Sequence, residues 1–248
     1  MDESLYRALA RLEDHHWWFT ARRRILARVV RHWVPIGSTV LDVGCGTGGL
    51  LSDLSNDYVV RGIDSSVRAL EACRARGITE AVEGTAMDSS TWGPLPVDAV
   101  CLLDVIEHLD DDVATLRAAR ESLRPGGYVM TTVPAFQWLW SGHDTANHHR
   151  RRYSLGQLNQ VHREAGLRRA YATYFNTLLF PAALAERLLS KAARRNGASA
   201  GLRAPPNLLN FSLHTIFSME SLPIESGRIR APLGLSVLCV AQRLHETR

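Results

Sequence analysis

Cysteine is scarce in this 248-residue sequence. The four cysteines are scattered, and no two of them form a C-x-x-C pair: Cys45, Cys73, Cys101 and Cys239. This spacing offers neither the framework of a small disulfide-stapled domain nor a zinc-finger pattern. We therefore expect reduced thiols, as in cytoplasmic proteins.

Long hydrophobic runs are also missing. No uninterrupted apolar stretch reaches the ~20 residues that a membrane-spanning helix needs. The first residues, Met1-Asp2-Glu3-Ser4, are acidic and lack the apolar core of a secretory signal. We expect a cytoplasmic protein, and peripheral contact with a membrane stays open.

Charge of one sign is only slightly in excess, with a formal net charge of +4 and a pI near 9.1. No aromatic-and-basic RNA-binding module is visible, so we expect no nucleic-acid partner. Two short arginine runs, Arg22–Arg24 and Arg150–Arg152, favour an anionic substrate or a membrane surface instead.

Apolar strand-like runs alternate with helical patterns along the middle of the chain. We expect strands at 39–43, 58–63, 97–103, 128–133 and 168–175, and helices at 67–75, 111–123 and 154–165. This alternation indicates a parallel sheet with helices on both faces. Four residues follow or end the first strands: Gly44, Asp64, Asp104 and Pro134. The carboxyl ends of parallel strands form one edge, where ligands bind.

The two ends of the chain depart from this alternation. Residues 1–36 are expected to form an N-terminal helical cap, with a helix at 5–33, and residues 37–174 the ligand-binding core. Residues 175–233 should form a helical insertion, either a lid or a membrane-facing surface, with helices near 178–189 and 208–222 and a linker at 191–206. Residues 234–248 should supply the final strand.

The most informative stretch is Thr39-Val40-Leu41-Asp42-Val43-Gly44-Cys45-Gly46-Thr47-Gly48-Gly49. Glycines let the backbone approach a ligand closely, and the helix that follows offers unpaired N–H groups. Gly44, Gly46 and Gly49 also fit the dinucleotide pattern G-x-G-x-x-G of nicotinamide-dependent oxidoreductases. Asp42 argues against that reading, because a carboxylate would face a cationic ligand group, which a pyrophosphate lacks.

The run V-L-D-V-G-C-G-T-G closely resembles the first motif of class I S-adenosylmethionine-dependent methyltransferases. Leu103-Asp104-Val105-Ile106-Glu107-His108-Leu109 resembles their fourth motif, and Arg124-Pro125-Gly126-Gly127 the hairpin before their fifth strand. The resemblance implies a Rossmann-like, doubly wound, mostly parallel seven-stranded sheet that binds S-adenosylmethionine.

Asp64 follows Asp42 by 22 positions (64 − 42) and ends the second strand. That spacing suits an acid that grips a ribose diol. For adenine, alignment puts Thr85 where the family has an acid, which leaves Asp88 as the other candidate. The resemblance thus assigns these residues to the cofactor: Asp42, Gly44, Cys45, Gly46, Asp64, Ser65, Thr85, Ala86, Asp88 and Leu103.

Two flanking segments look like a group of bacterial methyltransferases, related to quinone-precursor O-methyltransferases, from glycan and natural-product pathways. They are His16-Trp17-Trp18-Phe19 with Arg22-Arg23, and Leu139-Trp140-Ser141 with His143-Asp144 and His148 to Tyr153. The three consecutive aromatics either cover the cofactor crevice or pack in the core. A hydroxyl acceptor must lose a proton, and histidine suits that task near neutral pH. His143 and His148 are the favoured bases, with Asp144 as a possible orienting group.

Asp104-x-x-Glu107-His108 resembles the ligand set of some metal-dependent O-methyltransferases, and His148 could complete it. We assign no metal, because a Glu-His pair such as Glu107-His108 also follows this strand in metal-free relatives. The leading hypothesis is methyl transfer to a hydroxyl of a sugar, glycan precursor or natural product. Two alternatives stay open: an isoprenoid or lipid-linked substrate at a membrane surface, and a regulatory protein that binds the cofactor without turnover.

Overall fold

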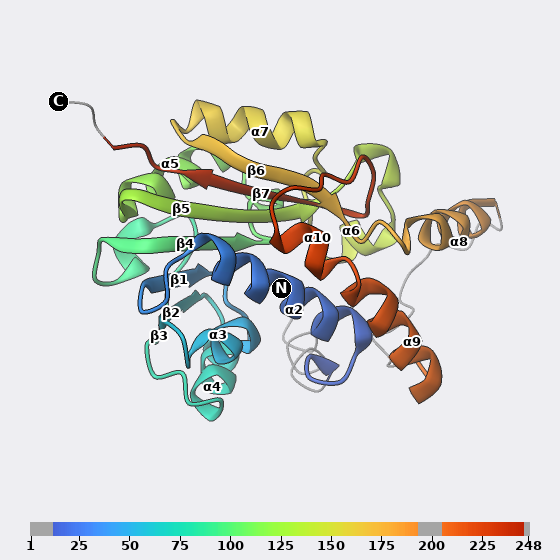
Figure 1. Cartoon of the computed structure of the whole chain (residues 1–248), viewed down its shortest axis with the longest axis horizontal. Coiled ribbons are helices and arrows are strands. Elements are labelled where there is room, and N and C mark those ends of the chain that lie inside the picture. Colours follow the sequence, from blue (N-terminus) through green and yellow to red (C-terminus); the bar gives the residue numbers. More distant parts are fainter. Residues whose placement is uncertain (1–11, 193–204, 246–248) are drawn as a thin grey trace.

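The protein, seen here in a computed structural model, is described for residues 12–192 and 205–245. Its centre is a seven-stranded sheet (Figure 1). The strands are β1 (Thr39–Val43), β2 (Val59–Asp64), β3 (Ala81–Glu83), β4 (Val97–Leu103), β5 (Leu123–Pro134), β6 (Arg168–Phe175) and β7 (Ser236–Gln242). Their order is β3-β2-β1-β4-β5-β7-β6, and β7 runs antiparallel to both neighbours. The mostly parallel, doubly wound sheet is confirmed.

Helices connect the strands and extend the fold at both ends. They are α2 (Trp17–Trp33), α3 (Gly49–Leu54), α4 (Val67–Ala75), α5 (Asp112–Ser122), α6 (Gly142–Ala146), α7 (Leu155–Glu164), α8 (Phe180–Ala192), α9 (Asn207–Ser218) and α10 (Ser221–Glu225). Short 3-10 turns lie at η1 (Ser89–Trp92), η2 (Ile106–His108) and η3 (Gln137–Leu139). Among the described residues, no helix is both long and apolar enough to cross a membrane.

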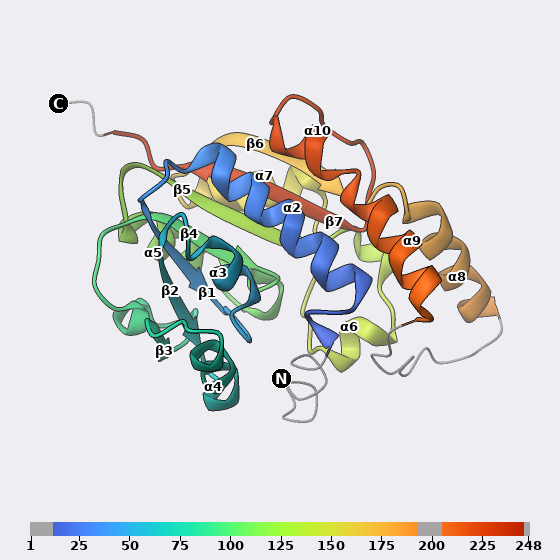
Figure 2. The same cartoon turned by 60° about the horizontal axis from the view of Figure 1, so that its bottom comes forward.

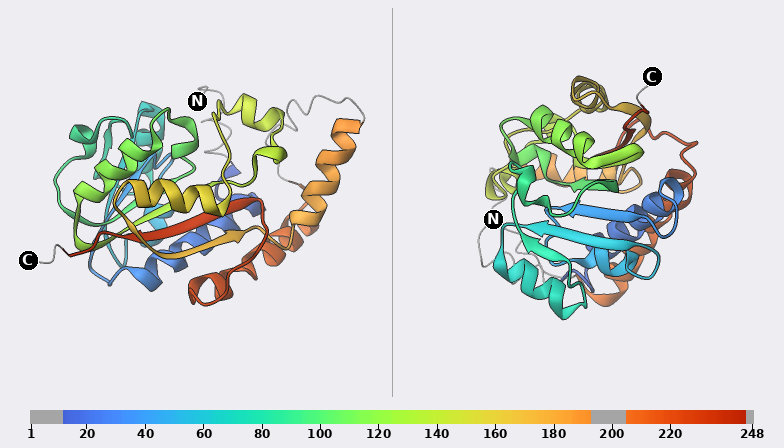
Figure 3. Two further views of the ribbon diagram at one scale, coloured as in Figure 1. Left: turned by 90° about the horizontal axis from the view of Figure 1, so that it is seen from above. Right: turned by 90° about the vertical axis from the view of Figure 1, so that its left-hand side faces the viewer.

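Two buried clusters lie on the two faces of the sheet. Figure 3 shows the helices that cover these faces. On one face, α2 packs through residues such as Ile25 and Val29 against Val40, Met130 and Val240. On the other face, α5 and α7 pack against β4, β5 and β7. Helix α9 lies beside α2 (Figure 2), and its Phe217 stacks on Phe175 at the end of β6. The insertion therefore extends the layer that α2 begins.

Most boundaries agree with expectation, and capping chemistry explains several of them. Ser154 caps α7 in a reciprocal box with Gln157, and Gly166 follows it at φ +77°. Pro181 stands in the first turn of α8, where a missing N–H costs nothing. The single helix expected at 208–222 is wrong, because α9 ends at Ser218 and α10 begins at Ser221. The continuous helix expected over 5–33 is also wrong, because a turn at 13–16 interrupts it before α2 begins at Trp17. Its part at 5–11 and the linker residues 193–204 lie outside the described residues.

Candidate functional site

The glycine loop after β1 turns sharply into α3. Gly44, Gly46 and Gly48 have φ of +81°, +55° and +78°, a region that residues with a Cβ rarely adopt. A Cβ on Gly44 would lie 2.8 Å from Val105 Cγ2, whereas one on Gly46 would meet open space. Packing against Val105 therefore requires a glycine at position 44. At position 46 the positive φ favours glycine, and the space beside it is open.

Asp64 ties this loop to the end of β2. Its Oδ2 accepts the Gly46 N–H at 2.8 Å, and its Oδ1 accepts the Ser66 N–H at 2.9 Å. A carboxylate offers two oxygens with two lone pairs each, so this residue type suits the two hydroxyls of a ribose. The expected neighbourhood of Asp64 and the glycine loop is thus present, and Ser65 beside them is exposed.

Asp42 is buried under the loop in β1. Within residues 12–192 and 205–245, the Asp42 Oδ1 has no hydrogen-bond partner. Burial raises the pKa of Asp42 to about 7, with Arg22 opposing that rise and Asp64 adding to it. A buried carboxyl with an unused oxygen fits a cationic ligand group nearby.

The two candidates for the adenine end sit in one turn after β3. The Thr85 hydroxyl accepts the Met87 N–H at 2.9 Å, and the Thr85 carbonyl accepts the indole N–H of Trp92. Asp88 is exposed and caps η1 through the Ser90 N–H. Ala86 and Leu103 are half-buried. Thr85 and Asp88 both stay predictions, although capping occupies the Asp88 carboxylate.

Arg22 enters this crevice from α2, which sequence reasoning did not anticipate. Its Nη2 lies 2.8 Å from Asp104 Oδ2 and donates to Thr132 Oγ1 at 2.6 Å. Its guanidinium carbon lies 5.3 Å from the Trp18 ring centroid. Trp17 and Trp18 also pack against the buried cluster under α2. Trp17 and Trp18 therefore pack at the margin of the core, half-buried, and Trp18 also lies against Arg22.

Glu107 is fully buried in η2, and among the described residues neither of its carboxyl oxygens has a hydrogen-bond partner. Burial, reinforced by Asp104, raises its pKa well above the usual range. Ligand atoms of Glu107, His108 and His149 all lie within 4.8 Å of one another. One oxygen and two nitrogens are donors that magnesium, manganese or zinc can use. His149, rather than the expected His148, joins this group, and Asp104 is held by Arg22.

Asp144 organises the loop after β5. Arg152 binds it with two contacts, Nε to Oδ1 at 2.6 Å and Nη2 to Oδ2 at 3.0 Å. His149 Nδ1 lies 2.9 Å from Asp144 Oδ1. Burial opposes ionisation, but the hydrogen bonds from His149 and Arg152 hold the pKa of Asp144 well below its usual range. An ionised Asp144 therefore orients His149, which sequence reasoning had listed with its neighbours but not favoured.

His143 and His148 lie near the Asp144–His149 pair. Among the described residues, neither of their side chains forms a hydrogen bond with Asp144. His143 Nε2 lies 3.2 Å from Asn147 Nδ2, and its ring centroid is 6.3 Å from that of His149. His148 is exposed and has φ +57°. Their role as bases stays a prediction.

The arginine runs are largely ion-paired within the chain. The partners are Asp104 for Arg22, Asp14 and Asp53 for Arg23, Asp110 for Arg150, Asp112 for Arg151 and Asp144 for Arg152. Tyr153 also donates to Asp112 at 2.6 Å. These contacts anchor α2, α5 and α6, so the runs by themselves do not argue for an anionic substrate.

The strand order, the glycine loop and the acid that ends β2 define a class I methyltransferase fold. Residues 11–170 match the family described as Methyltransferase domain. Because the match spans more than half of the chain, the protein belongs to this family of S-adenosylmethionine-dependent methyltransferases, whose cofactor is S-adenosylmethionine.

Curated relatives share part of the chain. It is 33% identical to the ubiquinone biosynthesis O-methyltransferase of Nitrosospira multiformis over 131 residues, which cover 46% of this chain and 54% of that protein. The corresponding enzyme of Paraburkholderia xenovorans is 32% identical over 131 residues, 46% of this chain and 56% of that protein. The chain thus spans about half the length of the curated relatives it matches.

Solved structures resemble almost the whole chain. A methyltransferase of Haloferax volcanii, solved with the Trm112 activator, has a TM-score of 0.63 at 20% identity and covers 99% of this chain and 97% of its own. Geranyl diphosphate methyltransferase with its cofactor has a TM-score of 0.59 at 17% identity, covering 98% and 92%. At these identities the likeness shows a shared fold alone.

Proposed function

We propose that this protein transfers the methyl group of S-adenosylmethionine to a hydroxyl of a small molecule. The observation that carries the proposal is the Asp144–His149 pair, which lies beside His108 after β4. Strand β4 pairs with β1, which leads into the glycine loop. A base on this edge of the sheet stands where an acceptor beside the cofactor would bind.

His149 has the arrangement of a general base. If its Nδ1–H donates to Asp144, its Nε2 carries the lone pair that can take the hydroxyl proton. Arg152 keeps Asp144 ionised, and the resulting pair would contribute a rate factor of ~10²–10⁴. Holding the acceptor in line with the methyl group would contribute up to ~7–11 kcal/mol more.

The experiment is an acceptor screen that measures methyl transfer to hydroxylated sugars, phenols and polyketides. His149→Ala should lower turnover roughly 100-fold or more while affinity for S-adenosylhomocysteine stays within about twofold. His32→Ala, an exposed histidine at the end of α2, serves as the matched control. His143→Ala and His148→Ala test the two bases that the sequence favoured. Full activity of His149→Ala would reject it as the base.

A metal-assisted form of the same reaction is the second candidate, favoured by the unpartnered carboxyl of Glu107 beside His108 and His149. A divalent cation there would lower the pKa of an acceptor hydroxyl. Dialysis against a chelator followed by readdition of magnesium, manganese or zinc separates the forms. Activity that returns only with metal, and not in Glu107→Gln, supports the metal; chelator-resistant activity supports His149 alone.

The acceptor itself is proposed as a sugar, a glycan precursor or a natural product. The exposed Trp138 stacks on Phe136 at 5.5 Å, and Phe136 stacks on Tyr174 at 4.8 Å, beside the loop that carries His149. Aromatic side chains supply flat apolar contact area. This supports an acceptor with an apolar or planar part.

An isoprenoid or lipid-linked acceptor at a membrane surface is the alternative, favoured by apolar side chains exposed on and after α9. They are Leu208, Leu209, Phe211, Ile216, Met219 and Leu222. A hollow of about 550 Å³ lies between α9 and the start of α2. Flotation with anionic vesicles tests this alternative, because a lid that only covers the substrate should not float. Binding of cofactor without transfer to any acceptor would instead support a regulatory protein. Cytoplasmic location stays a prediction of the sequence.

A further inference from the structure

Two thiols meet beneath the glycine loop. Cys45 belongs to the loop and Cys73 to α4, and their Sγ atoms lie 3.9 Å apart. All four cysteines of the chain are free, and Cys101 and Cys239 are buried in β4 and β7. The sulfurs of a disulfide lie about 2.05 Å apart, so a movement of about 2 Å would join Cys45 to Cys73.

The two sulfurs fill space that neighbouring glycines leave open. A Cβ on Gly48 would lie 2.7 Å from Cys73 Sγ, and a Cβ on Gly62 would lie 2.7 Å from Cys45 Sγ. Both distances are too short for a carbon atom beside a sulfur. Tight packing therefore holds the two thiols against each other.

Both thiols also reach the peptide at the centre of the glycine loop. The Cys73 thiol donates to the Gly46 carbonyl oxygen at 3.3 Å, and Cys45 Sγ lies 3.8 Å from the same oxygen. The Gly46 N–H donates to Asp64 Oδ2 at 2.8 Å. The thiol pair and the acid that ends β2 therefore fix the two polar groups of the Gly46 residue together.

We infer that Cys45 and Cys73 are a site of oxidative modification, where a hydroperoxide converts the two thiols to a disulfide that weakens binding of the cofactor. The inference goes beyond the proposed function, because it concerns a covalent change of the glycine loop and not the acceptor. Its effect on the cofactor rests on the family's use of S-adenosylmethionine.

The reaction balances with hydrogen peroxide as the oxidant. Cys45 is 9% exposed and Cys73 0%, so Cys45 is the thiol that peroxide reaches first. The Cys45 sulfur attacks one peroxide oxygen, the O–O bond breaks, and the departing oxygen leaves as water with the thiol proton, which yields a sulfenic acid. The Cys73 sulfur then displaces the sulfenic hydroxyl, which leaves as water with the second thiol proton. One peroxide is reduced to two water molecules, and two thiols are oxidised to one disulfide.

The surroundings of Cys45 should make this oxidation slow. The hydrogen bond with Cys73, burial and the carboxylates of Asp42 and Asp64 raise the pKa of Cys45. The thiolate is the reactive form of cysteine, and little of it is present near neutral pH. We therefore expect the disulfide to accumulate under sustained exposure to peroxide and not within a brief pulse.

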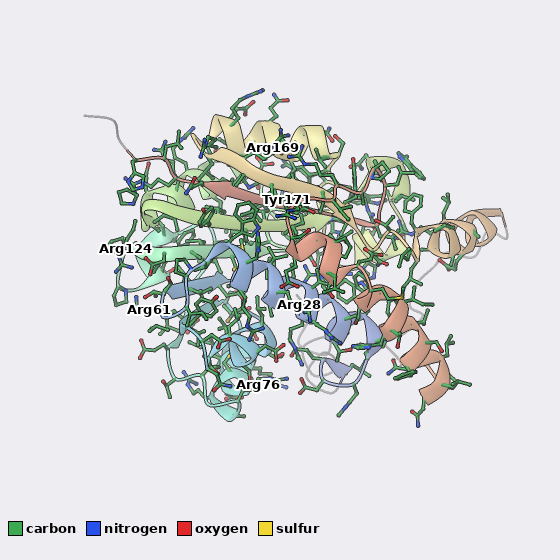
Figure 4. The ribbon with its side chains drawn as sticks, viewed as in Figure 1. Arg28, Arg61, Arg76, Arg124, Arg169 and Tyr171 are labelled. Carbon is green, nitrogen blue, oxygen red and sulfur yellow. The ribbon has the colours of Figure 1, made fainter. Side chains whose placement is uncertain are left out.

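The loop, and not α4, should move when the sulfurs join. Arg76 follows the last turn of α4, where Figure 4 labels it, and its Nη2 lies 2.8 Å from Asp14 Oδ2. Asp14 Oδ1 in turn lies 2.9 Å from Arg23 Nη1 of α2. These ion pairs tie the end of α4 that carries Cys73 to α2. A disulfide also has no S–H, so the Gly46 carbonyl loses its donor.

Mass spectrometry tests whether the bond forms. After sustained incubation of the folded wild type with hydrogen peroxide, its mass should fall by that of two hydrogens, and digestion should release one linked peptide pair that contains Cys45 and Cys73. Cys73→Ser, which keeps a donor for Gly46, should give no linked pair. Cys239→Ala removes a buried thiol elsewhere and is the matched control, so it should give the full yield. Cys73→Ala is the second variant, for use if the serine variant does not fold.

Calorimetry with S-adenosylhomocysteine tests the effect on the cofactor. The oxidised wild type should bind roughly tenfold more weakly than the reduced protein, and dithiothreitol should restore the affinity. Peroxide should leave the affinity of Cys73→Ser within about twofold of its own untreated value. Because the coupling is reciprocal, a tenfold difference means that saturating ligand raises the reduction potential of the pair by about 30 mV.

Each remaining outcome counts against the inference. Thiols that stay reduced, or that reach separate sulfinic acids without a linked peptide pair, overturn it. A disulfide that leaves the affinity unchanged overturns the effect on the cofactor. An equal loss of affinity in treated Cys73→Ser does so too, because the damage then lies elsewhere in the chain. If the reduced wild type does not bind S-adenosylhomocysteine, the effect on the cofactor fails together with the proposed function, and the peptide map alone decides whether the disulfide exists.

Discussion

The two halves of the crevice are built in different ways. On the β1–β2 side, backbone conformation makes the site, through glycines at positive φ and the N–H groups that Asp64 accepts. On the β4–β5 side, long-range side-chain contacts make it, such as Arg22 with Asp104 and Arg152 with Asp144. The first half should be sensitive to added side-chain atoms, and the second to lost charge.

The largest effect is expected where a buried charge loses its partner. Asp144 and Arg152 have side-chain exposures of 0% and 3%. Asp144→Asn leaves the Arg152 charge uncompensated, so it should lower the free energy of unfolding by about 3–5 kcal/mol. Chemical denaturation measures this loss. Asp110→Asn is the matched control, because the exposed Arg150–Asp110 pair should contribute at most about 1 kcal/mol. Equal effects would contradict the claim that the β4–β5 side depends on its buried charge pair.

Acid should destabilise the β4–β5 side through His162. Its Nε2 lies 3.0 Å from Thr131 Oγ1 and its Nδ1 2.8 Å from the Leu158 carbonyl oxygen. Burial lowers its pKa to about 4, below the unfolded value near 6.5. The unfolded chain therefore binds the proton first, and stability present above pH 6.5 is lost as pH falls to about 4.

This linkage amounts to about 3 kcal/mol. The free energy of unfolding, measured by chemical denaturation from pH 4 to 8, should fall more steeply with decreasing pH in the wild type than in His162→Gln. Parallel pH profiles would show that His162 does not carry the effect.

On the glycine side, two positions form a matched pair. Gly46 and Gly37 have φ of +55° and +85°, and a Cβ on either meets no atom within 4 Å. Alanine at each should cost roughly 1–2 kcal/mol of stability through backbone strain. Only Gly46→Ala should also weaken cofactor binding, by about tenfold, because we propose that the cofactor lies against Gly46. Calorimetry with S-adenosylhomocysteine on both variants checks this, and equal weakening would place the ligand elsewhere.

The smallest expected effect is a pH dependence of cofactor binding. Burial raises the pKa of Asp42 to about 7, so this carboxyl is largely protonated below that pH. A cationic ligand favours the carboxylate, and binding must then release a proton. Affinity for S-adenosylhomocysteine should rise with pH by at most about tenfold per unit and level off above pH 7. Asp42→Asn should abolish the slope, and a flat wild-type profile would contradict a cation beside Asp42.

The same contrast explains how far the sequence predicted the molecule. The glycine loop and the strand ends are local patterns, so the residues that meet at the carboxyl edge could be expected from their order along the chain. Strand β3, with only three residues, Ala81–Glu83, carries too little pattern to be anticipated. The break between α9 and α10 does have a local signal that the expected single helix overlooked, because Pro223 has no N–H to donate to the Met219 carbonyl four residues earlier.

The contacts on the acceptor side could not be predicted, because they join residues that are far apart in the sequence or are placed by an irregular turn. Arg22 and Asp104 are 82 positions apart (104 − 22), and nothing local indicates their contact. The sequence alone does not distinguish His143, His148 and His149 as candidate bases. The positive φ of His148 redirects the chain, and His149 then faces Asp144 with both its backbone N–H and its ring. A spacing of five residues between Asp144 and His149 does not reveal that turn.

The most direct test of the account is calorimetric titration with S-adenosylhomocysteine of the wild type, Asp64→Ala and Asp57→Ala. Asp57 precedes β2 at its opposite end and is ion-paired with Arg31, so it controls for loss of a charge. The account predicts micromolar binding to the wild type and Asp57→Ala, and at least about tenfold weaker binding to Asp64→Ala. Equal affinity in all three proteins, or no binding to the wild type, would contradict a cofactor site at this edge of the sheet.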